Sequence, residues 1–314
     1  MTNTTGVPNR YSEFACDTAE VVQKPCSVAP SDWRLLRRLE LPAKFNDPNG
    51  GEVRRALVVD VETTGLNVET DDVTQLAMLQ FEYEVETGLI LTVYRDHAFE
   101  ELREPNVPIS EEASLITGIT ADMVAGKEIN ADSVDALVET SDLVIAHNAT
   151  FDRPMVEKHW TCFEKKPWAC SYTGVDWLRH GFSAGKLDYL GMQFGWFYEG
   201  HRALADCEAC LALLAQALPN DGARVMTAVR RSASKTEWLI RAVGSPYERK
   251  DVLKARGYKW RGDGLPHGRV WWTIVEDTDA EVAWLSEEVY GREISLNPTP
   301  VTALTKYSER LWEF

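Results

Sequence analysis

The sequence lacks long apolar runs, a secretory leader and an excess of basic residues. No apolar run approaches the ~20 residues that a membrane span needs, and residues 1–14 contain no basic region followed by an apolar stretch. We therefore expect a soluble cytoplasmic protein without membrane contact. Lys and Arg number 33 against 49 Asp and Glu, and the formal net charge of −16 argues against tight unaided DNA binding. A site that holds a few nucleotides through divalent cations would escape this limit.

Cysteine is also scarce, with six residues in 314. That is too few for the disulfide framework of a secreted protein, so free thiols are expected. Cys207 and Cys210 form a Cys-x-x-Cys pair, but it lies inside a helical pattern, and no second pair follows at zinc-site spacing. We interpret this pair as helix packing.

The sequence patterns divide the chain into four parts, and the 44% hydrophobic content is ample for two buried cores. The parts are an N-terminal arm with a short helix (1–50), an α/β domain (51–219), a linker (220–235) and a small α+β accessory domain (236–314). The short helix is expected at 33–39, where Ser31 and Asp32 would cap it and Pro42 would end it.

Apolar and alternating segments of the α/β domain predict five strands with helices between them. The strands are expected at 56–60, 74–84, 90–94, 142–147 and 168–172. The helices are expected near 110–115 and 132–140, from 151, and at 203–218 before Pro219. The accessory domain shows a strand (238–243), a helix (247–256), a strand (270–275), a helix (280–290) and then extended residues.

A pair of carboxylates follows the first strand. Asp60 and Glu62 lie in the run Asp-Val-Glu-Thr-Thr-Gly-Leu, and side chains two apart on a strand point to one face. Adjacent carboxylates repel unless a positive charge lies between them, and Mg²⁺ and Mn²⁺ prefer such oxygen ligands. The run predicts a divalent-metal site; the alternative is an ordinary strand end followed by a polar turn.

Two further motifs place acidic residues near helix starts. In His-Asn-Ala-Thr-Phe-Asp, ending at Asp152, a buried strand leads into a helix, so Asp152 faces the same sheet edge. Helix capping is the alternative role for Asp152. In His-Arg-Ala-Leu-Ala-Asp, His201 precedes a helix that carries Asp206 near its start, so both can reach one site. A surface histidine is the alternative for His201.

These three motifs, in this order, resemble the DnaQ-like exonuclease superfamily in its DEDDh branch, and the similarity spans residues 56–218. The whole chain more loosely resembles bacterial stand-alone exonucleases that are similar to the DNA polymerase III epsilon subunit. The resemblance implies an α/β fold of the ribonuclease H-like type, with a mixed five-stranded sheet flanked by helices.

The resemblance also implies two divalent cations, Mg²⁺ or Mn²⁺. Asp60 would be shared between them, Glu62 and Asp206 would complete the tighter site, and Asp152 would assist the second. The residues that would hold the terminal nucleotide are Thr63, Thr64, Gly65, Leu66 and Phe151. Core packing remains the alternative for the last two.

The predicted reaction is hydrolysis of a terminal phosphodiester. One cation lowers the pKa of a water, His201 removes its proton, and the hydroxide attacks in line while the second cation stabilises the leaving 3′-oxygen. Because the base must be a neutral imidazole, the rate should rise with pH between roughly 6 and 8.

The leading hypothesis is a 3′→5′ exonuclease that releases nucleoside 5′-monophosphates from single-stranded DNA or DNA 3′ ends. It would act in proofreading or repair, with a polymerase or replisome component as a partner. Two alternatives stay open: a 3′→5′ exoribonuclease on short RNA, and a non-catalytic nucleic-acid or replisome docking protein. No residue decides whether a 2′-hydroxyl is accepted.

Basic residues alternate with aromatic ones in the accessory domain. The candidate nucleic-acid contacts are Arg249, Lys250, Lys254, Arg256, Lys259 and Trp260. This combination suits single-strand binding through phosphate contacts and base stacking. The alternative is that the tryptophans form a small core and the basic residues cover a solvated helix face.

Overall fold

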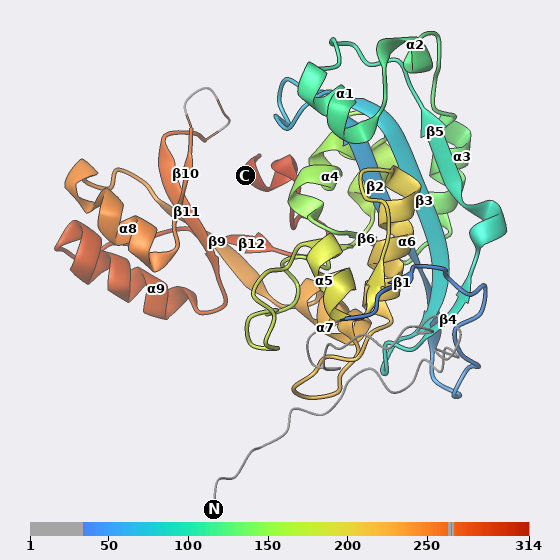
Figure 1. Ribbon diagram of the computed structural model, residues 1–314. Coiled ribbons are helices and arrows are strands. Elements are labelled where there is room, and N and C mark those ends of the chain that lie inside the picture. The colour runs from blue at the N-terminus through green and yellow to red at the C-terminus, as the bar shows by residue number, and fades with distance from the viewer. Residues whose placement is uncertain (1–33, 263–264, 266, 314) are drawn as a thin grey trace, which may run out of the picture.

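The computed structural model describes residues 34–262, 265 and 267–313 (Figure 1). The expected helix cap at Ser31 and Asp32, together with Cys16 and Cys26, lies outside the described residues. The four cysteines within them are free thiols, and Cys207 and Cys210 are buried in helix packing, as expected. No helix in the described part of the chain has the length and apolarity to cross a membrane.

A mixed sheet forms the centre of the larger unit, which is the part of the chain from β1 (Arg37–Arg38) to α7 (Val225–Ala233) (Figure 1). Its strands are β2 (Val53–Thr63), β3 (Val73–Glu84), β4 (Ile90–Val93), β5 (Phe99–Leu102), β6 (Leu143–Ala146) and β7 (Trp168–Cys170). The order is β4-β3-β2-β6-β7; β2 is antiparallel to β3 and parallel to β6, and β6 is parallel to β7. The expected mixed sheet is confirmed, but it has six strands rather than five.

The sixth strand, β5, was not predicted. It pairs with β3 at residues 75–78, whereas β4 pairs with the same edge of β3 at residues 81 and 83. The sequence Phe-Glu-Glu-Leu has two adjacent charged residues and no alternation, so only the pairing with β3 marks it as a strand.

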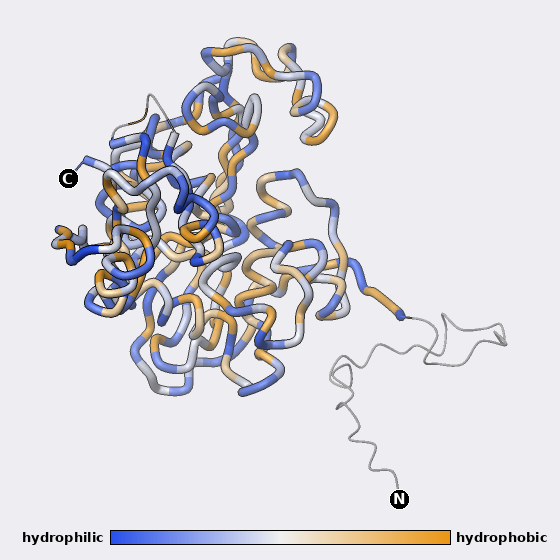
Figure 2. The backbone as a smooth tube through the Cα atoms, turned by 90° about the vertical axis from the view of Figure 1, so that its left-hand side faces the viewer, coloured by the Kyte–Doolittle hydropathy of each residue, from blue (hydrophilic) through white to orange (hydrophobic). Residues whose placement is uncertain are grey.

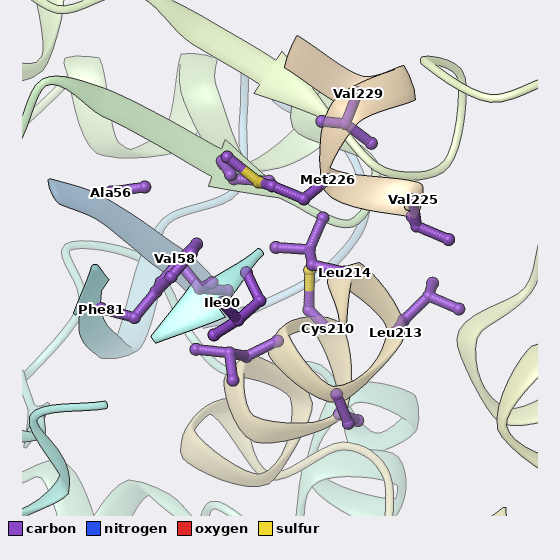
Figure 3. Close-up of a cluster of buried hydrophobic side chains, with 14 of the residues drawn as sticks. Ala56, Val58, Phe81, Ile90, Cys210, Leu213, Leu214, Val225, Met226 and Val229 are labelled. Carbon is purple, nitrogen blue, oxygen red and sulfur yellow. The ribbon is translucent and has the colours of Figure 1, made fainter. Parts of the chain in front are cut away.

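Helices pack against both faces of this sheet (Figure 1). These are α3 (Ala131–Glu139), α4 (Ala149–Glu157), α5 (Leu187–Gln193), α6 (Ala203–Leu214) and α7 (Val225–Ala233). Helices α1 (Glu111–Thr117) and α2 (Ala121–Val124) precede them in the chain. Alternate side chains of β2 enter two different cores. Ala56 and Val58 pack with α6 and α7, as Figure 3 shows, and Leu57 and Val59 pack with α3 and α4.

A second, smaller sheet lies in the C-terminal part of the chain. Its order is β10-β11-β9-β12, all antiparallel, with β9 (Glu237–Ala242), β10 (Lys259–Arg261), β11 (Val270–Val275) and β12 (Thr299–Val301). Helices α8 (Lys250–Arg256) and α9 (Thr278–Trp284), the latter continued by a π-helical turn (Leu285–Tyr290), pack on one face. The predicted strand–helix–strand–helix order is present, and β10 is an addition.

The prediction of a short helix at 33–39 is wrong. Residues 34–36 are irregular, and Arg37–Arg38 form a two-residue strand, β1, that pairs in parallel with β8 (Trp196–Phe197). The Arg38 guanidinium lies 5.4 Å from the Phe197 ring centroid and bonds Glu199 at 3.1 Å. Leu39 and Leu41, two apart, both pack on the core, which is the spacing of an extended chain.

The expected linker at 220–235 is mostly helix α7, so the prediction of a plain connector was wrong there. Val225, Met226 and Val229 are fully buried, because their helical spacing turns one apolar face to the sheet core. Helix α6 ends at Leu214 rather than near 218, and the chain turns back through a bridge between Ala217 and Arg224.

Candidate active site

The end of strand β2 carries two of the predicted carboxylates. Asp60 and Glu62 lie on the same strand face as Val58, and helix α6 packs against that face. A break in the β2–β3 register between Glu62 and Thr63 ends the regular pairing. Asp60 is half-buried and Glu62 is buried.

The first turn of α6 brings in a third carboxylate. One oxygen from each of Asp60, Glu62 and Asp206 can be chosen so that all three lie within 4.8 Å of one another. The Asp206 carboxylate is oriented by two donors: the Tyr198 hydroxyl donates to Oδ1 at 2.7 Å, and the Arg202 backbone N–H donates to Oδ2 at 3.1 Å.

Asp152, the fourth carboxylate, comes from helix α4. It is 3% exposed, and its Oδ1 accepts a hydrogen bond from the backbone N–H of Val61, between Asp60 and Glu62, at 3.3 Å. Because α4 lies on the opposite face of β2 from α6, Asp152 reaches the strand end from the other side. The structure thus brings all four predicted carboxylates to one strand end.

Burial raises the pKa of all four carboxyl groups. Neighbouring carboxylates raise the pKa of Asp60 further, and Glu62 reaches about 7. For Asp152 and Asp206, burial again outweighs the hydrogen bonds that lower the pKa. Two neighbours act in the opposite direction: the Arg202 guanidinium lowers the pKa of Glu62, and His201 lowers that of Asp206.

This arrangement fits divalent cations. Two buried and two half-buried carboxyl groups at one strand end are unfavourable without positive charge between them, and hard divalent ions accept such ligands. Among the described residues, Asp60, Glu62 and Asp206 form the one His/Cys/Asp/Glu group close enough to hold a metal ion.

His201 lies at the rim of this cluster. It precedes α6, has a left-handed backbone conformation (φ 61°) and is exposed to solvent. This conformation is uncommon for a residue with a side chain. His201 therefore lies next to the helix start that carries Asp206, with its side chain exposed to solvent.

The predicted nucleotide-holding residues divide into a framework and an exposed tip. Thr64 is buried, and its hydroxyl donates to Asp71 at 3.0 Å, while its backbone N–H donates to the Asp72 carbonyl at 2.9 Å. At Gly65 an added Cβ would lie 2.6 Å from the Asp71 carboxylate, so a larger residue would displace the carboxylate that accepts from Thr64. Leu66 is 84% exposed.

The exposure of Leu66 removes core packing as its role, whereas Phe151 is half-buried and packs against the α3–α4 core. Two more exposed apolar side chains, Leu115 (79%) and Ile116 (48%), lie on α1, which is joined to this loop by the Ser110 N–H to the Thr64 carbonyl. Figure 2 shows the segment with α1 and α2 standing above the main body, with hydrophobic stretches along it.

Sequence reasoning missed Tyr198 and Arg202. Tyr198 is half-buried, and its pKa is raised by burial and by the charge of Asp206. The Arg202 side chain donates to the Thr117 carbonyl at the end of α1, which ties the start of α6 to α1. No spacing rule connects a tyrosine eight residues upstream with an aspartate, so only the fold could reveal the first pair.

The six candidate contacts of the C-terminal unit have different surroundings. Trp260 is 50% exposed and lies 5.4 Å from Trp271 between ring centroids; the Lys254 ammonium lies 5.8 Å from the Trp271 ring centroid. Lys259 lies 5.5 Å from the ring centroid of Trp272. These basic groups are therefore close to aromatic faces.

Of the other three candidates, Arg256 and Lys250 contact side chains of the C-terminal unit, and Arg249 is exposed. Arg256 pairs with Glu281 at 3.0 Å, and its guanidinium covers Trp284 at 4.8 Å. Lys250 donates to the Tyr247 hydroxyl at 2.7 Å. For Arg256, covering a small aromatic core is thus the role that the structure supports.

Comparison with known proteins identifies the family. A family model described as exonuclease, RNase_T, matches residues 57–214, which is half of the chain. DNA polymerase III of the PolC type from Listeria welshimeri is 29% identical over 240 residues, which cover 72% of this chain and 15% of that protein. The counterpart from Lacticaseibacillus paracasei is 32% identical over 176 residues, which cover 54% of this chain and 12% of that protein.

Two solved structures match the chain with low TM-scores. Exonuclease X in complex with 5′-overhanging duplex DNA has a TM-score of 0.42 and 25% identity, and the match covers 56% of this chain and 99% of that chain. Exonuclease I of E. coli with a dT13 oligonucleotide has a TM-score of 0.41 and 18% identity, covering 51% and 40%. On the match to the family model, the chain belongs to the RNase_T exonuclease family and is a nuclease of the DnaQ-like type.

Proposed function

We propose that this chain is a metal-dependent 3′→5′ exonuclease that releases nucleoside 5′-monophosphates from DNA 3′ ends, in proofreading or repair. The observation that carries the proposal is the convergence of Asp60, Glu62 and Asp206 within 4.8 Å, with Asp152 bonded to the same strand end. Hydrolysis of a phosphodiester requires positive charge where negative charge develops, and four carboxylates can recruit it.

When bound, two divalent cations, Mg²⁺ or Mn²⁺, would activate a water and stabilise the leaving 3′-oxygen. Asp60, Glu62 and Asp206 would hold one of them, and Asp60 with Asp152 would hold the other. His201 would accept the proton of the attacking water, and its exposure allows that proton to pass to solvent. Leu66 and the backbone of residues 63–65 would contact the terminal nucleotide.

DNA is the favoured substrate because the curated relatives are DNA polymerases. A polymerase or replisome component is the corresponding partner. Since the chain spans 15% or less of the length of these relatives, neither their activity nor their partners transfer to it without a test. RNA therefore stays as the second arm of the experiment.

The test is digestion of matched 5′-labelled single-stranded DNA and RNA with Mg²⁺, Mn²⁺ or EDTA. Wild type should give a metal-dependent ladder that shortens from the 3′ end, and Asp60→Ala should give none. Glu86→Ala is the control, because Glu86 is exposed in the turn after β3, at the opposite end of that strand from the site. No product from either strand with any metal would favour the docking-protein hypothesis.

The strand upstream of the 3′ end requires its own contacts. We propose that Trp260 stacks on a base and that Lys254, Lys259, Lys250 and Arg249 contact phosphates. Support comes from the half-exposed indole and from the short distances between ammonium groups and rings.

A further inference from the structure

The residue after Asp152 carries a fully buried charge. Arg153 has 0% exposure, and its Nε donates to Glu157 Oε1 at 2.7 Å, within α4. Its other donors leave the helix: Nη1 donates to the carbonyl of Lys306 at 2.7 Å, and Nη2 to that of Leu304 at 2.7 Å. A longer bond, 3.3 Å, joins Nη1 to the Ala303 carbonyl. Three of its four acceptors thus lie about 150 positions later in the sequence.

The same C-terminal segment, residues 303–310, holds α4 and β7 through further bonds. The Ser308 hydroxyl donates to Glu157 Oε2 at 2.5 Å, and Arg310 donates to Glu157 Oε1 at 3.3 Å. The backbone N–H of Trp168, at the start of β7, donates to the Ala303 carbonyl at 2.8 Å. Figure 1 shows this end of the chain against α4.

Helix α4 has an incomplete backbone ladder where Asp152 lies. Pro154 has no N–H, so the Thr150 carbonyl lacks the usual partner four residues on. The N-cap residue, Asn148, is left-handed (φ 89°) and makes no side-chain capping bond. The start of α4 therefore relies on side-chain contacts for its position, and Arg153, directly after the first turn, makes four hydrogen bonds.

We infer that residues 303–310 position Asp152 by anchoring Arg153, so that cation binding by the carboxylate cluster depends on this distant segment. The inference rests on the proposed function, because it takes Asp152 as a cation ligand. A buried guanidinium must keep its acceptors. Loss of the three carbonyls would force Arg153 toward water and turn α4, carrying Asp152 away from the Val61 N–H.

Deleting residues 236–314 would have two effects on the protein. If residues 236–314 were only an accessory unit, their deletion would test strand binding alone. The deletion also removes all three carbonyl acceptors of Arg153. Loss of activity after truncation would therefore not identify a nucleic-acid contact, and point variants in the full chain are required.

The experiment measures Mn²⁺ binding by calorimetry and by electron paramagnetic resonance on the full chain. Arg153→Lys keeps the charge but loses the planar fork that reaches several carbonyls. We expect Mn²⁺ binding at one of the two sites to weaken about tenfold, as for other changes to residues that orient metal ligands. Excess Mn²⁺ should restore kcat on DNA, which a general loss of folded protein would not permit.

Tyr258→Phe is the matched control. It removes a buried hydrogen bond, from the Tyr258 hydroxyl to Glu281 Oε1 at 3.0 Å, in the C-terminal unit and away from α4. It should lower the melting temperature and leave the Mn²⁺ isotherm unchanged. Glu157→Gln is the second variant if Arg153→Lys does not fold, and it should weaken Mn²⁺ binding in the same direction.

A folded Arg153→Lys protein with the wild-type Mn²⁺ isotherm overturns the inference. Equal weakening in Tyr258→Phe also overturns it, because the effect would then follow stability rather than the position of Asp152. If wild type itself binds no Mn²⁺, the proposed function fails together with the inference. If wild type binds two ions and Arg153→Lys binds them equally well, only the inference fails.

Discussion

Asp60 is the carboxylate most affected by its neighbours, since burial and three other acidic groups all raise its pKa. In the metal-free protein this repulsion opposes folding. Asp60→Asn keeps the shape and removes one charge, so we expect the metal-free protein to become more stable by roughly 0.5–2 kcal/mol. Urea unfolding in EDTA measures this difference.

Saturating Mn²⁺ should reverse the order, because ligand binding stabilises only the protein that retains its full site. Asp60→Asn should remain inactive under both conditions. Glu86→Gln is the matched removal of a charge at an exposed position. It should change neither the stability in EDTA nor the stability in saturating Mn²⁺. An Asp60→Asn protein that is less stable than wild type in EDTA would contradict the account of repulsion.

Tyr198 orients Asp206 through a 2.7 Å hydrogen bond. Tyr198→Phe removes only this hydroxyl, and we expect Mg²⁺ to be required at about tenfold higher concentration for half-maximal activity. Tyr94→Phe is the control, since its hydroxyl makes a similar 2.6 Å bond to Glu82. An unchanged Mg²⁺ requirement in Tyr198→Phe would remove Tyr198 from the site.

The residues of the site differ in how far the sequence could predict them. Asp60 and Glu62 could be paired from the two-residue period of a strand, and the structure brings Asp206 beside them. Tyr198 and Arg153 could not be found in this way. The first acts across a loop that only tertiary packing closes, and the second acts on carbonyl groups about 150 residues away.

Among the elements, those with a strong period were predicted and those made by pairing were not. Strands β2 and β3 alternate or run apolar, and β11 was predicted with its observed bounds. Strands β1 and β5 are short and charged, and they exist because β8 and β3 offer free edges. Helix α7 has a clear apolar face, but Arg230 and Arg231 near its end are also typical of a polar connector.

The loop from β2 to β3 is held by Asp72, and its stability should depend on pH. The Asp72 carboxylate accepts from Arg103 at 2.8 Å, from the Asn106 N–H at 2.7 Å and from His159 at 2.6 Å. Although burial acts in the opposite direction, these hydrogen bonds lower the pKa of Asp72 to about 2.

A carboxyl group whose pKa is lower in the folded state contributes stability above its unfolded pKa, and this contribution is lost as pH falls through the folded pKa. Asp72→Asn should therefore cost ~1.5–3 kcal/mol at pH 7, and the difference from wild type should shrink between pH ~4 and ~2. Urea unfolding across this range checks it. A difference independent of pH would show that the charge does not matter.

At the scale of the whole molecule, a net charge of −16 makes a local basic and aromatic surface important for strand binding. Trp260→Ala should weaken affinity for a long single strand about tenfold, within the ~1–3 kcal/mol that one stacked base contributes. Lys254→Ala should reduce the salt dependence of binding by about one phosphate contact. Fluorescence anisotropy in EDTA measures both.

Neither change should alter the rate on a dinucleotide, which is too short to reach beyond the site. Leu178→Ala is the control, because Leu178 is 74% exposed but lies in the larger unit. Equal loss of affinity in Leu178→Ala, or no loss in Trp260→Ala, would assign the aromatic residues to packing alone.

The distance along the chain between Arg153 and its acceptors also matters during translation. Ribosomes add ~5–20 residues per second, so roughly 8 to 30 s separate the emergence of Arg153 from that of Lys306, 153 positions later. Over that interval α4 has no acceptors for its buried charge outside the helix. Until residues 303–306 have emerged, a nascent chain would thus hold Asp152 less firmly and bind cations at the carboxylate cluster more weakly.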